Sequence, residues 1–248
     1  MLDPAIHSAF NACLDAIRKG DAQAVAACFT EDAEINGSLM GPPRGAAGFA
    51  EAASKWLDQL PGLRLEPLRT YGEGPELAAK MRLTWKDRVA ESIWAFRFEL
   101  SGKATRLTTL WEPADILGGS PALLRPTLEA QVVAYYKTYN EDDEEAHVKL
   151  LSRDILYFGS VSRLTAEGVD TARGIFKSAH ARMGLKHFDL ERIYGTGPHL
   201  AAQVRMHGTN PGHAPEEGVW VFRVDEQDRF DRVSILWNPG SFLTMGPQ

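Results

Sequence analysis

The stretch Tyr71-Gly-Glu-Gly-Pro-Glu-Leu-Ala-Ala-Lys-Met-Arg82 returns later in the chain as Tyr194-Gly-Thr-Gly-Pro-His-Leu-Ala-Ala-Gln-Val-Arg205. The second occurrence lies 123 residues after the first, the difference between 194 and 71. Two shorter pairs follow in the same order, each 126 residues apart: Trp94-Ala-Phe-Arg97 with Trp220-Val-Phe-Arg223, and Leu110-Trp111-Glu-Pro113 with Leu236-Trp237-Asn-Pro239. Matches that keep their order indicate a duplicated unit of roughly 110–120 residues, which is too long for a solenoid repeat. We therefore expect two small domains, each with its own core.

Length and composition agree with two globular domains. The chain has 248 residues, of which 44% are hydrophobic and 24% are charged, ordinary values for a soluble protein. The net charge is −6 and no basic cluster is visible, which argues against nucleic acid as a partner. No apolar run approaches the ~18–20 residues of a membrane span. Because the first residues also lack a signal-peptide pattern, we expect no membrane association and a cytoplasmic location.

The two cysteines of the chain, Cys13 and Cys28, both lie in the first repeat. Their spacing is not that of metal ligands, so we expect no metal site. Two thiols in a helical region are typical of core residues in a reducing compartment.

Each repeat begins with helical periodicity and continues with strand-like segments. In the first repeat, apolar residues at helical spacing mark a helix from Ile6 to Ile17, which Gly20 ends, and Asp21 caps a second helix. A third helix carries Phe49 to Leu60. The expected strands of the first repeat are 33–36, 64–70, 76–85, 91–100 and 104–112.

The second repeat keeps this order, which predicts the α+β class: helices first, then an antiparallel sheet. Its charged run 141–145 is typical of a solvated first helical turn. The stretch 113–127 holds three prolines and a Gly-Gly pair, as linkers do. We expect a first domain over 1–114, a linker over 115–127 and a second domain over 128–248. The expected elements of the second repeat are helices at 132–139 and 169–183 and strands at 155–158, 188–193, 199–207, 218–224 and 230–238.

Several motifs carry a resemblance to a known family. They are Gly20-Asp21 and Cys28-Phe-Thr-Glu-Asp-Ala-Glu-Ile35 in the first repeat, and Arg205-Met-His-Gly-Thr-Asn-Pro-Gly212, Phe222-Arg223 and Leu236-Trp237 in the second. Both repeats resemble the NTF2-like superfamily, in particular its branch of SnoaL-like polyketide cyclases and ketosteroid isomerases. The resemblance implies two tandem cone-shaped domains, each with three helices packed on a curved antiparallel sheet. It also implies apolar cavities for small hydrophobic molecules, no cofactor, and a pseudo-dimer within one chain, with a homodimer as the alternative.

The groups that the ketosteroid isomerases use can be traced one by one. Their aspartate base aligns with Gly37 in the first repeat and Gly159 in the second, so it is absent from both. Their carboxylic acid aligns with a tryptophan in each repeat. Their tyrosine donor aligns with Cys13 in the first repeat and with Tyr135 in the second. Two of the three groups are therefore missing from both repeats, and the ketosteroid isomerase reaction itself is not expected.

The epoxide-hydrolase branch of the superfamily carries an Arg-x-Asp pair on a middle strand. The nearest matches here are Arg82-Leu-Thr84 and Arg205-Met-His207, in which the carboxylate is replaced. Some polyether cyclases of the superfamily are also tandem two-domain chains that open epoxides. An epoxide-opening enzyme therefore stays an alternative.

The second repeat offers the richer set of polar residues. Arg205 and His207 are two apart on a predicted strand, so their side chains share a face. A histidine transfers protons near neutral pH, an arginine stabilises an enolate or carboxylate, and Tyr135 supplies a further donor. These residues predict a cofactor-independent cyclase or isomerase acting on a polyketide-like or polycyclic intermediate. The alternative is that Gln203, Arg205 and His207 form the wet outer face of the strand.

Paired tryptophans recur in both repeats at Trp94 and Trp220, and at Trp111 and Trp237. They fit core packing, and they equally fit stacking on a flat apolar ligand. We assign substrate binding to Trp94, Trp111, Trp220, Trp237, Tyr157 and Arg82. With the carboxylates missing, a non-catalytic binder or carrier of a hydrophobic small molecule, and a protein-interaction module, remain open.

Overall fold

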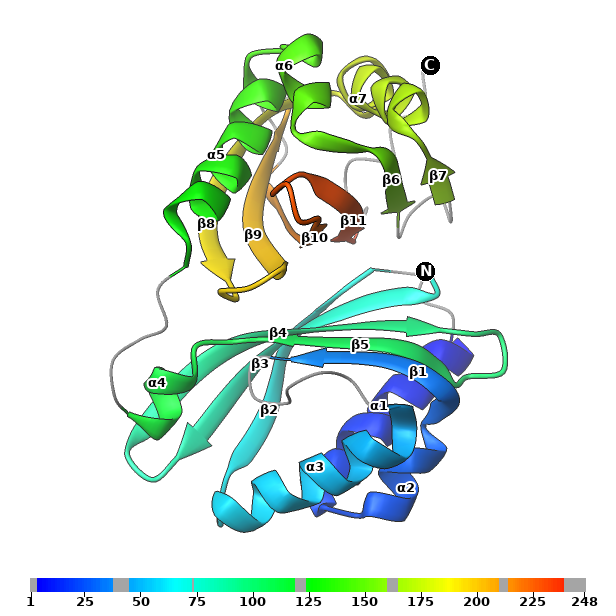
Figure 1. The fold of residues 1–248 in the computed structure, drawn as a ribbon, viewed down its shortest axis with the longest axis vertical. Helices are drawn as coiled ribbons and strands as arrows, with labels where there is room; N and C mark the ends of the chain where they lie inside the picture. The colour runs from blue at the N-terminus through cyan, green and yellow to red at the C-terminus, as the bar shows by residue number, and fades with distance from the viewer. Residues whose placement is uncertain are drawn as a thin grey trace. The chain divides into compact units, whose positions relative to one another are not determined.

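The computed structural model describes residues 4–37, 45–72, 74–118, 124–159, 165–209 and 214–238. The chain divides into two compact units, and each unit contains helices followed by a sheet of mostly antiparallel strands (Figure 1). This arrangement confirms the predicted α+β class and the duplication.

Three helices open the first unit: α1 (Pro4–Lys19), α2 (Ala22–Ala27) and α3 (Gly45–Gln59). Gly20 ends α1 with a positive φ of 67°, a conformation that costs glycine little. Asp21 then caps α2, because its side chain accepts a hydrogen bond from the Ala24 backbone N–H at 3.0 Å. Both local predictions are confirmed.

The sheet of the first unit has the strand order β1-β5-β4-β3-β2. Neighbouring strands from β2 to β5 are antiparallel, while β1 runs parallel to β5. The first strand is longer than the predicted 33–36. The strands are β1 (Phe29–Gly37), β2 (Arg64–Tyr71), β3 (Glu76–Trp85), β4 (Arg88–Phe98) and β5 (Ala104–Leu110).

A short helix, α4 (Pro113–Leu117), follows the first sheet and overlaps the predicted linker 115–127. Pro113 suits the first helical position, and the Glu112 side chain accepts from the Ala114 N–H at 3.0 Å. Ile116 is fully buried in the core of the first unit. The short helix α4 therefore packs on the core of the first unit through Ile116, whose apolar side chain is buried there.

The helices of the second unit are α5 (Pro126–Asn140), α6 (Glu144–Lys149) and α7 (Val169–Met183). Asp143 caps α6 through the Ala146 N–H at 2.9 Å. Glu144 is not simply solvated, as the charged run suggested: it pairs with Arg173 and, at 3.1 Å, with Lys177, which ties α6 to α7. The hydrogen bond from Arg173 lowers the pKa of Glu144.

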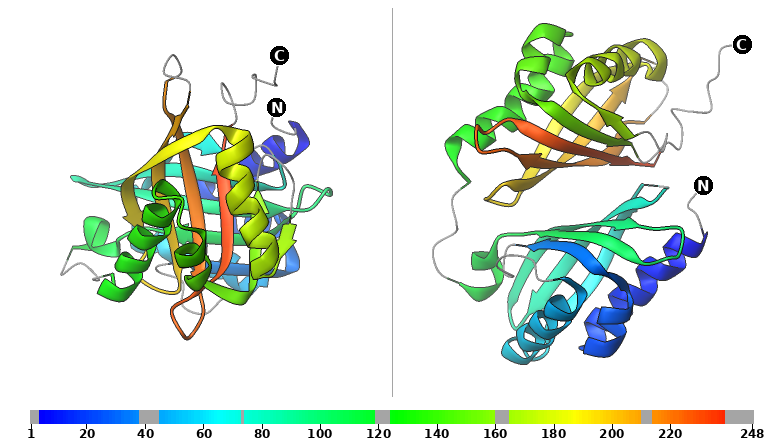
Figure 2. Two further views of the ribbon diagram at one scale, coloured as in Figure 1. Left: turned by 90° about the horizontal axis from the view of Figure 1, so that it is seen from above. Right: turned by 45° about the vertical axis from the view of Figure 1, so that its right-hand side comes forward.

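The sheet of the second unit has the order β7-β6-β11-β10-β9-β8, with β6 parallel to β11 and the other neighbours antiparallel where pairing is assigned (Figure 2). The three-residue strand β7 was not predicted, since so short a segment carries no periodicity. The strands are β6 (Leu151–Gly159), β7 (Thr165–Glu167), β8 (Leu185–Tyr194), β9 (His199–Gly208), β10 (Glu216–Val224) and β11 (Phe230–Trp237).

Candidate functional site

A chain of four hydrogen-bonded polar side chains crosses the interior of the second unit. Tyr135 and Thr138 come from α5, His147 from α6 and Tyr157 from β6. The Tyr135 and Tyr157 hydroxyl oxygens lie 3.2 Å apart, and His147 Nε2 lies 3.3 Å from the Tyr157 hydroxyl. On the other side of the ring, His147 Nδ1 lies 3.0 Å from Thr138 Oγ1. We call these four residues the polar chain.

The Thr138 hydroxyl fixes the direction of the hydrogen bonds. Thr138 has one hydroxyl proton, which it donates to the Tyr135 carbonyl oxygen at 2.8 Å. Thr138 Oγ1 must therefore accept a hydrogen bond from the N–H group at His147 Nδ1. In the neutral ring this leaves His147 Nε2 as an acceptor for the Tyr157 hydroxyl, and Tyr157 then accepts from Tyr135. The hydroxyl protons of Tyr135 and Tyr157 thus both point along the polar chain towards the His147 imidazole.

The polar chain is enclosed by aromatic rings. Tyr135 and His147 are fully buried, and their ring centroids are 4.6 Å apart. Burial raises the pKa of Tyr135 and of Tyr157 well above the usual value of a tyrosine, because an ionised phenol would lose its hydration. Both hydroxyls therefore stay protonated and serve as hydrogen-bond donors. Other rings in contact with the polar chain belong to Tyr136, Tyr139, Phe176, Phe222 and Phe230.

Tyr136, next to the polar chain, has a buried hydroxyl for which the described residues provide no hydrogen-bond partner. Its ring lies 5.8 Å from Phe188 and 6.2 Å from Trp220, centroid to centroid. Leaving a buried hydroxyl unpaired costs about 1–3 kcal/mol. The Tyr136 hydroxyl is therefore a donor that a ligand or water inside the second unit would satisfy.

The first unit lacks the polar chain although its framework is the same. α1 and α5, α2 and α6, and the start of β1 and β6 are related by one offset of 122 residues, the difference between 126 and 4. At this offset all four positions in the first unit carry side chains of its apolar core. Cys13 corresponds to Tyr135, Ala16 to Thr138, Val25 to His147 and Ile35 to Tyr157.

Two of the predicted catalytic residues, Arg205 and His207, lie on the outer face of β9. Val204 and Met206, which alternate with them, belong to the core of the second unit, so Arg205 and His207 point the other way. The structure therefore does not bring them together with Tyr135. Arg205 is exposed and His207 is half-buried, whereas Gln203, the third residue of the alternative wet face, is buried. The spacing of Arg205 and His207 predicts that the two side chains share a face of the strand, whereas the direction of that face depends on which neighbours pack onto the helices.

On that outer face both residues pair with carboxylates of β8. Arg205 lies 2.5 Å from Glu191, and His207 Nε2 lies 2.7 Å from Asp189. The hydrogen bond with His207 lowers the pKa of Asp189. Neither ion pair is buried, since the Arg205 and Asp189 side chains are each more than half exposed.

The predicted substrate-binding residues are divided between the cores and the surface. Trp94 and Trp111 belong to the core of the first unit, and Trp220 and Trp237 to the core of the second. Trp220 lies close to Gly218, where a Cβ atom would come within 2.6 Å of the indole, so the position requires glycine. Tyr157 is a member of the polar chain.

Arg82 is the exception among these residues. Its guanidinium lies 3.5 Å from Glu66 and is half exposed. Its neighbours Met81 and Leu83 are core residues of the first unit, so Arg82 faces away from that core.

His147 was missed by the sequence reasoning. It stands directly after the charged run, where a solvated helix is the ordinary interpretation. The internal repeat carries a signal for His147: at the offset of 122, this residue matches Val25, an apolar residue at a helical core position. A histidine in the place of a core valine marks a buried polar site.

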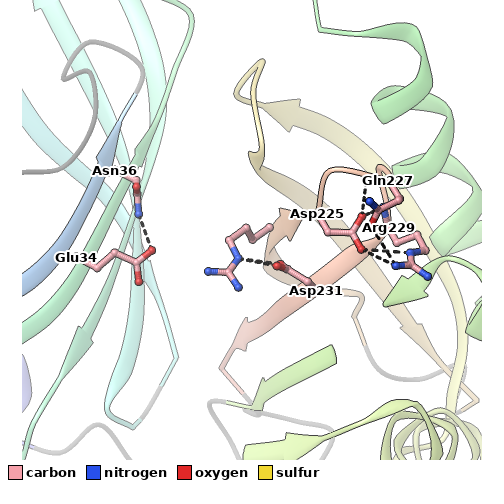
Figure 3. A network of polar contacts seen from close by, with 7 residues as sticks. Glu34, Asn36, Asp225, Gln227, Arg229 and Asp231 are labelled. Atoms are coloured by element: carbon pink, nitrogen blue, oxygen red, sulfur yellow. Dashed lines mark hydrogen bonds and ion pairs between the residues drawn. The ribbon is translucent and has the colours of Figure 1, made fainter. Parts of the chain in front are cut away.

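Two further sets of polar contacts are local to their own strands and turns (Figure 3). In the first unit, Asn36 Nδ2 donates to Glu34 at 3.1 Å on β1. In the second, Asp225 accepts from the backbone N–H groups of Gln227 and Arg229, each at 2.9 Å, and so fixes the turn between β10 and β11. Neither set includes a residue of the polar chain. Among the described ranges, no group of three or more His, Cys, Asp or Glu is placed to hold a metal ion.

Comparisons with known proteins address the family. The model of the SnoaL-like domain matches residues 10–107 and 132–233. No curated protein matches the chain. Within the ranges that the structure describes, no helix is both long and apolar enough to cross a membrane.

Similar solved structures each resemble about one half of the chain. One is a putative SnoaL-like polyketide cyclase from Shewanella denitrificans, with 20% identity and a TM-score of 0.39 over 47% of this chain and 94% of that one. Another is a putative ketosteroid isomerase from Kribbella flavida, with 19% identity and a TM-score of 0.38 over 44% of this chain and 76% of that one.

Proposed function

The chain belongs to the SnoaL-like domain family, and from this premise we propose that its second unit is a cofactor-independent isomerase or cyclase for a hydrophobic carbonyl compound. One observation carries the proposal. The second unit keeps a polar chain in an apolar core, whereas the first unit folds around apolar side chains at the same four positions. Folding does not require the polar chain, and this favours a role in chemistry.

The acid–base role falls to His147 acting through Tyr157. His147 Nε2 takes the proton of the Tyr157 hydroxyl while that hydroxyl takes a proton from the carbon next to the substrate carbonyl. The transfer is concerted, because burial raises the pKa of Tyr157 and makes a free tyrosinate costly. Thr138 positions the imidazole through Nδ1 and does not touch the substrate.

Tyr136 supplies a hydrogen bond to the enolate oxygen that forms in this step, whereas the hydroxyl proton of Tyr135 is donated to Tyr157. Donors held in a water-poor site stabilise developing negative charge more strongly than water does. Burial raises the pKa of Tyr136 and keeps this donor protonated. Returning the proton at another carbon gives an isomerisation, and attack of the enolate on a second carbonyl gives a cyclisation.

A non-catalytic carrier is the second candidate, and the Tyr136 hydroxyl favours it specifically. A buried donor among Phe188 and Trp220 suits a flat ligand that bears a hydrogen-bond acceptor, whether or not the ligand reacts. In that case the polar chain orders the interior of the second unit around the ligand and transfers no proton.

The test measures deuterium incorporation next to the carbonyl of a bicyclic ketone, 2-tetralone, in deuterium oxide. We expect exchange above the buffer rate, and a loss of about 10²-fold or more in His147→Val, the magnitude of general acid–base catalysis. His207→Ala is the matched control, because His207 is a histidine on the outer face of β9, and it should keep the wild-type rate.

The outcomes separate the candidates. Tryptophan fluorescence that changes on ketone addition without any exchange supports the carrier. Loss of exchange in His207→Ala but not in His147→Val would overturn our assignment and return the acid–base role to the outer face.

A further inference from the structure

Three buried polar atoms of the first unit have no hydrogen-bond partner among the described residues: Ser92 Oγ and Trp94 Nε1 on β4, and Trp56 Nε1 on α3. Ser92 and Trp94 are two apart, so their side chains share a face of β4. That face is the inner one, because Ala90, Trp94 and Phe96 all belong to the core of the first unit. Trp56 packs against the same core. Three hydrogen-bonding groups are therefore turned inwards and left unpaired.

These unpaired groups lie close to Trp111, another tryptophan of that core. β4 and β5 are antiparallel, and the register of their pairing ends with Ile93 opposite Leu110. The next residues, Ser92 and Trp111, therefore come side by side, as an antiparallel ladder requires. The Trp111 ring in turn lies 6.0 Å from the Trp56 ring, centroid to centroid. The strand and the helix thus bring the unpaired groups to one region of the interior.

The second unit differs from the first at one of these positions. At the offset of 126 residues that relates the tryptophan motifs, Ser92 corresponds to Gly218 and Trp94 to Trp220. The Trp220 indole lies so close to Gly218 that a Cβ atom there would come within 2.6 Å of it. Ser92 has this Cβ atom, so the Trp94 indole cannot lie over residue 92 in the same way. The serine therefore keeps the indole out of the Trp220 position and adds a hydroxyl at a place where the second unit has none.

The chemistry of the unpaired groups defines the class of ligand that they fit. An indole N–H can only donate a hydrogen bond, and a serine hydroxyl can donate as well as accept. Buried donors in folded proteins are nearly always satisfied by a protein group or by an ordered water. A carbonyl oxygen offers two lone pairs to such donors, and the faces of tryptophan rings suit a flat apolar molecule. An aromatic carbonyl compound meets both requirements.

We propose that the interior of the first unit is a second binding site, which takes a flat aromatic carbonyl compound. The Trp94 and Trp56 indole N–H groups and the Ser92 hydroxyl are its hydrogen-bond donors. The ligand is bound without reaction, because the positions of the polar chain carry apolar core side chains in this unit. None of the three donors belongs to the polar chain, so the site does not rest on the function proposed for the second unit.

The experiment titrates the native full-length protein, labelled with ¹⁵N at tryptophan, with 9-fluorenone and with fluorene. Fluorene has the same rings as fluorenone but lacks the oxygen, so the pair isolates the hydrogen-bond acceptor. We expect fluorenone to move the indole ¹H–¹⁵N signals of Trp94 and Trp56 downfield and to bind at least ~5-fold more tightly than fluorene, which is the effect of one hydrogen bond. Trp94→Phe and Trp56→Phe assign the two signals.

Variants at residue 92 separate the two roles of the serine. Ser92→Ala keeps the Cβ atom and removes the hydroxyl, so the affinity for fluorenone should fall ~5-fold. Ser92→Gly also lets the Trp94 indole fold over residue 92, and it should lower the affinity further. Tyr136→Phe is the matched control, because it removes the unpaired donor of the second unit, and it should leave the Trp94 shift unchanged. Circular dichroism of each variant confirms that it is folded.

Four results would overturn the proposal. They are equal binding of fluorene and fluorenone, wild-type affinity in Ser92→Gly, shifts confined to the Trp220 and Trp237 signals, and no shift up to the solubility limit of the ketone. The last result would mean that buried water, and no ligand, satisfies the three donors.

Discussion

The two units place different side chains on the same framework. Asp21 and Asp143 cap the corresponding helices α2 and α6 through the same bond to a backbone N–H. Inside, the first unit is apolar where the second holds the polar chain. The same fold therefore accepts either apolar or polar side chains at these four positions, provided that the polar side chains hydrogen-bond to one another.

The cost of burying an unpaired polar group explains why the four polar residues occur together. A polar group in an apolar core costs several kcal/mol when it is unpaired, and little when it is hydrogen-bonded. Tyr157 satisfies both His147 and Tyr135, and Thr138 satisfies the other side of the imidazole. Removal of one member leaves the others unpaired, so each single substitution should cost more than its own bond.

The two units should differ most in their stability at alkaline pH. Burial raises the pKa of Tyr135, Tyr136 and Tyr157 in the folded state. Below pH ~10 both states hold these protons, and stability is unaffected; above it only the unfolded chain releases them, so stability falls by about 1.4 kcal/mol per pH unit for each tyrosine. The tyrosinate absorbance of these three residues should rise only as the second unit unfolds.

Tyr157→Phe provides the control for this titration. It removes one titrating group, so the dependence of unfolding free energy on pH should become shallower by one proton. Tyrosines that ionise near pH ~10 while circular dichroism stays native would contradict the enclosed interior of the second unit.

Exchanging the side chains of one pair of corresponding residues, Val25 and His147, should have the next largest effect on stability. Val25→His places an imidazole among Ala16 and Ile35, which offer no side-chain hydrogen bond, and should cost about 3 kcal/mol of unfolding free energy. His147→Val leaves the Tyr157 hydroxyl without its acceptor and should cost about 2 kcal/mol. Urea unfolding of the full chain measures both. Equal tolerance of histidine in the two units would refute the claim that the polar chain supports His147.

The smallest difference in stability between the two units should come from ion pairs on corresponding strands. Glu76 is 5% exposed and bridges Arg97 at 3.3 Å and Arg106 at 2.7 Å. In the second unit Arg223, the counterpart of Arg97, instead pairs with Asp231 at 2.8 Å. We expect Glu76→Gln to cost about 1–2 kcal/mol, because two guanidinium groups lose one buried carboxylate.

Asp231→Asn is the matched variant for this comparison. It should cost less than about 1 kcal/mol, since its pair is partly exposed and the described residues give Asp231 a single arginine partner. Thermal unfolding of the two variants compares them. A larger loss of thermal stability in Asp231→Asn than in Glu76→Gln would contradict this expectation, which rests on burial and on the number of arginine partners.

The sequence predicted the framework because the signals for it are local or repeated. Helical spacing, the Asp21 cap and the internal repeat place the helices and most strands without knowledge of the tertiary structure. The direction of Arg205 and His207 on β9 was not accessible in the same way, because strand alternation defines two faces without saying which one packs onto the helices. His147 was hidden for a different reason: its neighbours along the chain are charged, and its partners Thr138 and Tyr157 lie on other elements.

The tautomer of His147 tests the central claim most directly. In protein labelled with ¹⁵N at histidine, long-range ¹H–¹⁵N correlation spectra distinguish the two ring nitrogens, and His147→Val identifies the signal. The account predicts a proton on Nδ1, donated to Thr138, and an unprotonated Nε2 that accepts from Tyr157. A proton on Nε2 at neutral pH would contradict the ordered polar chain and the acid–base role derived from it.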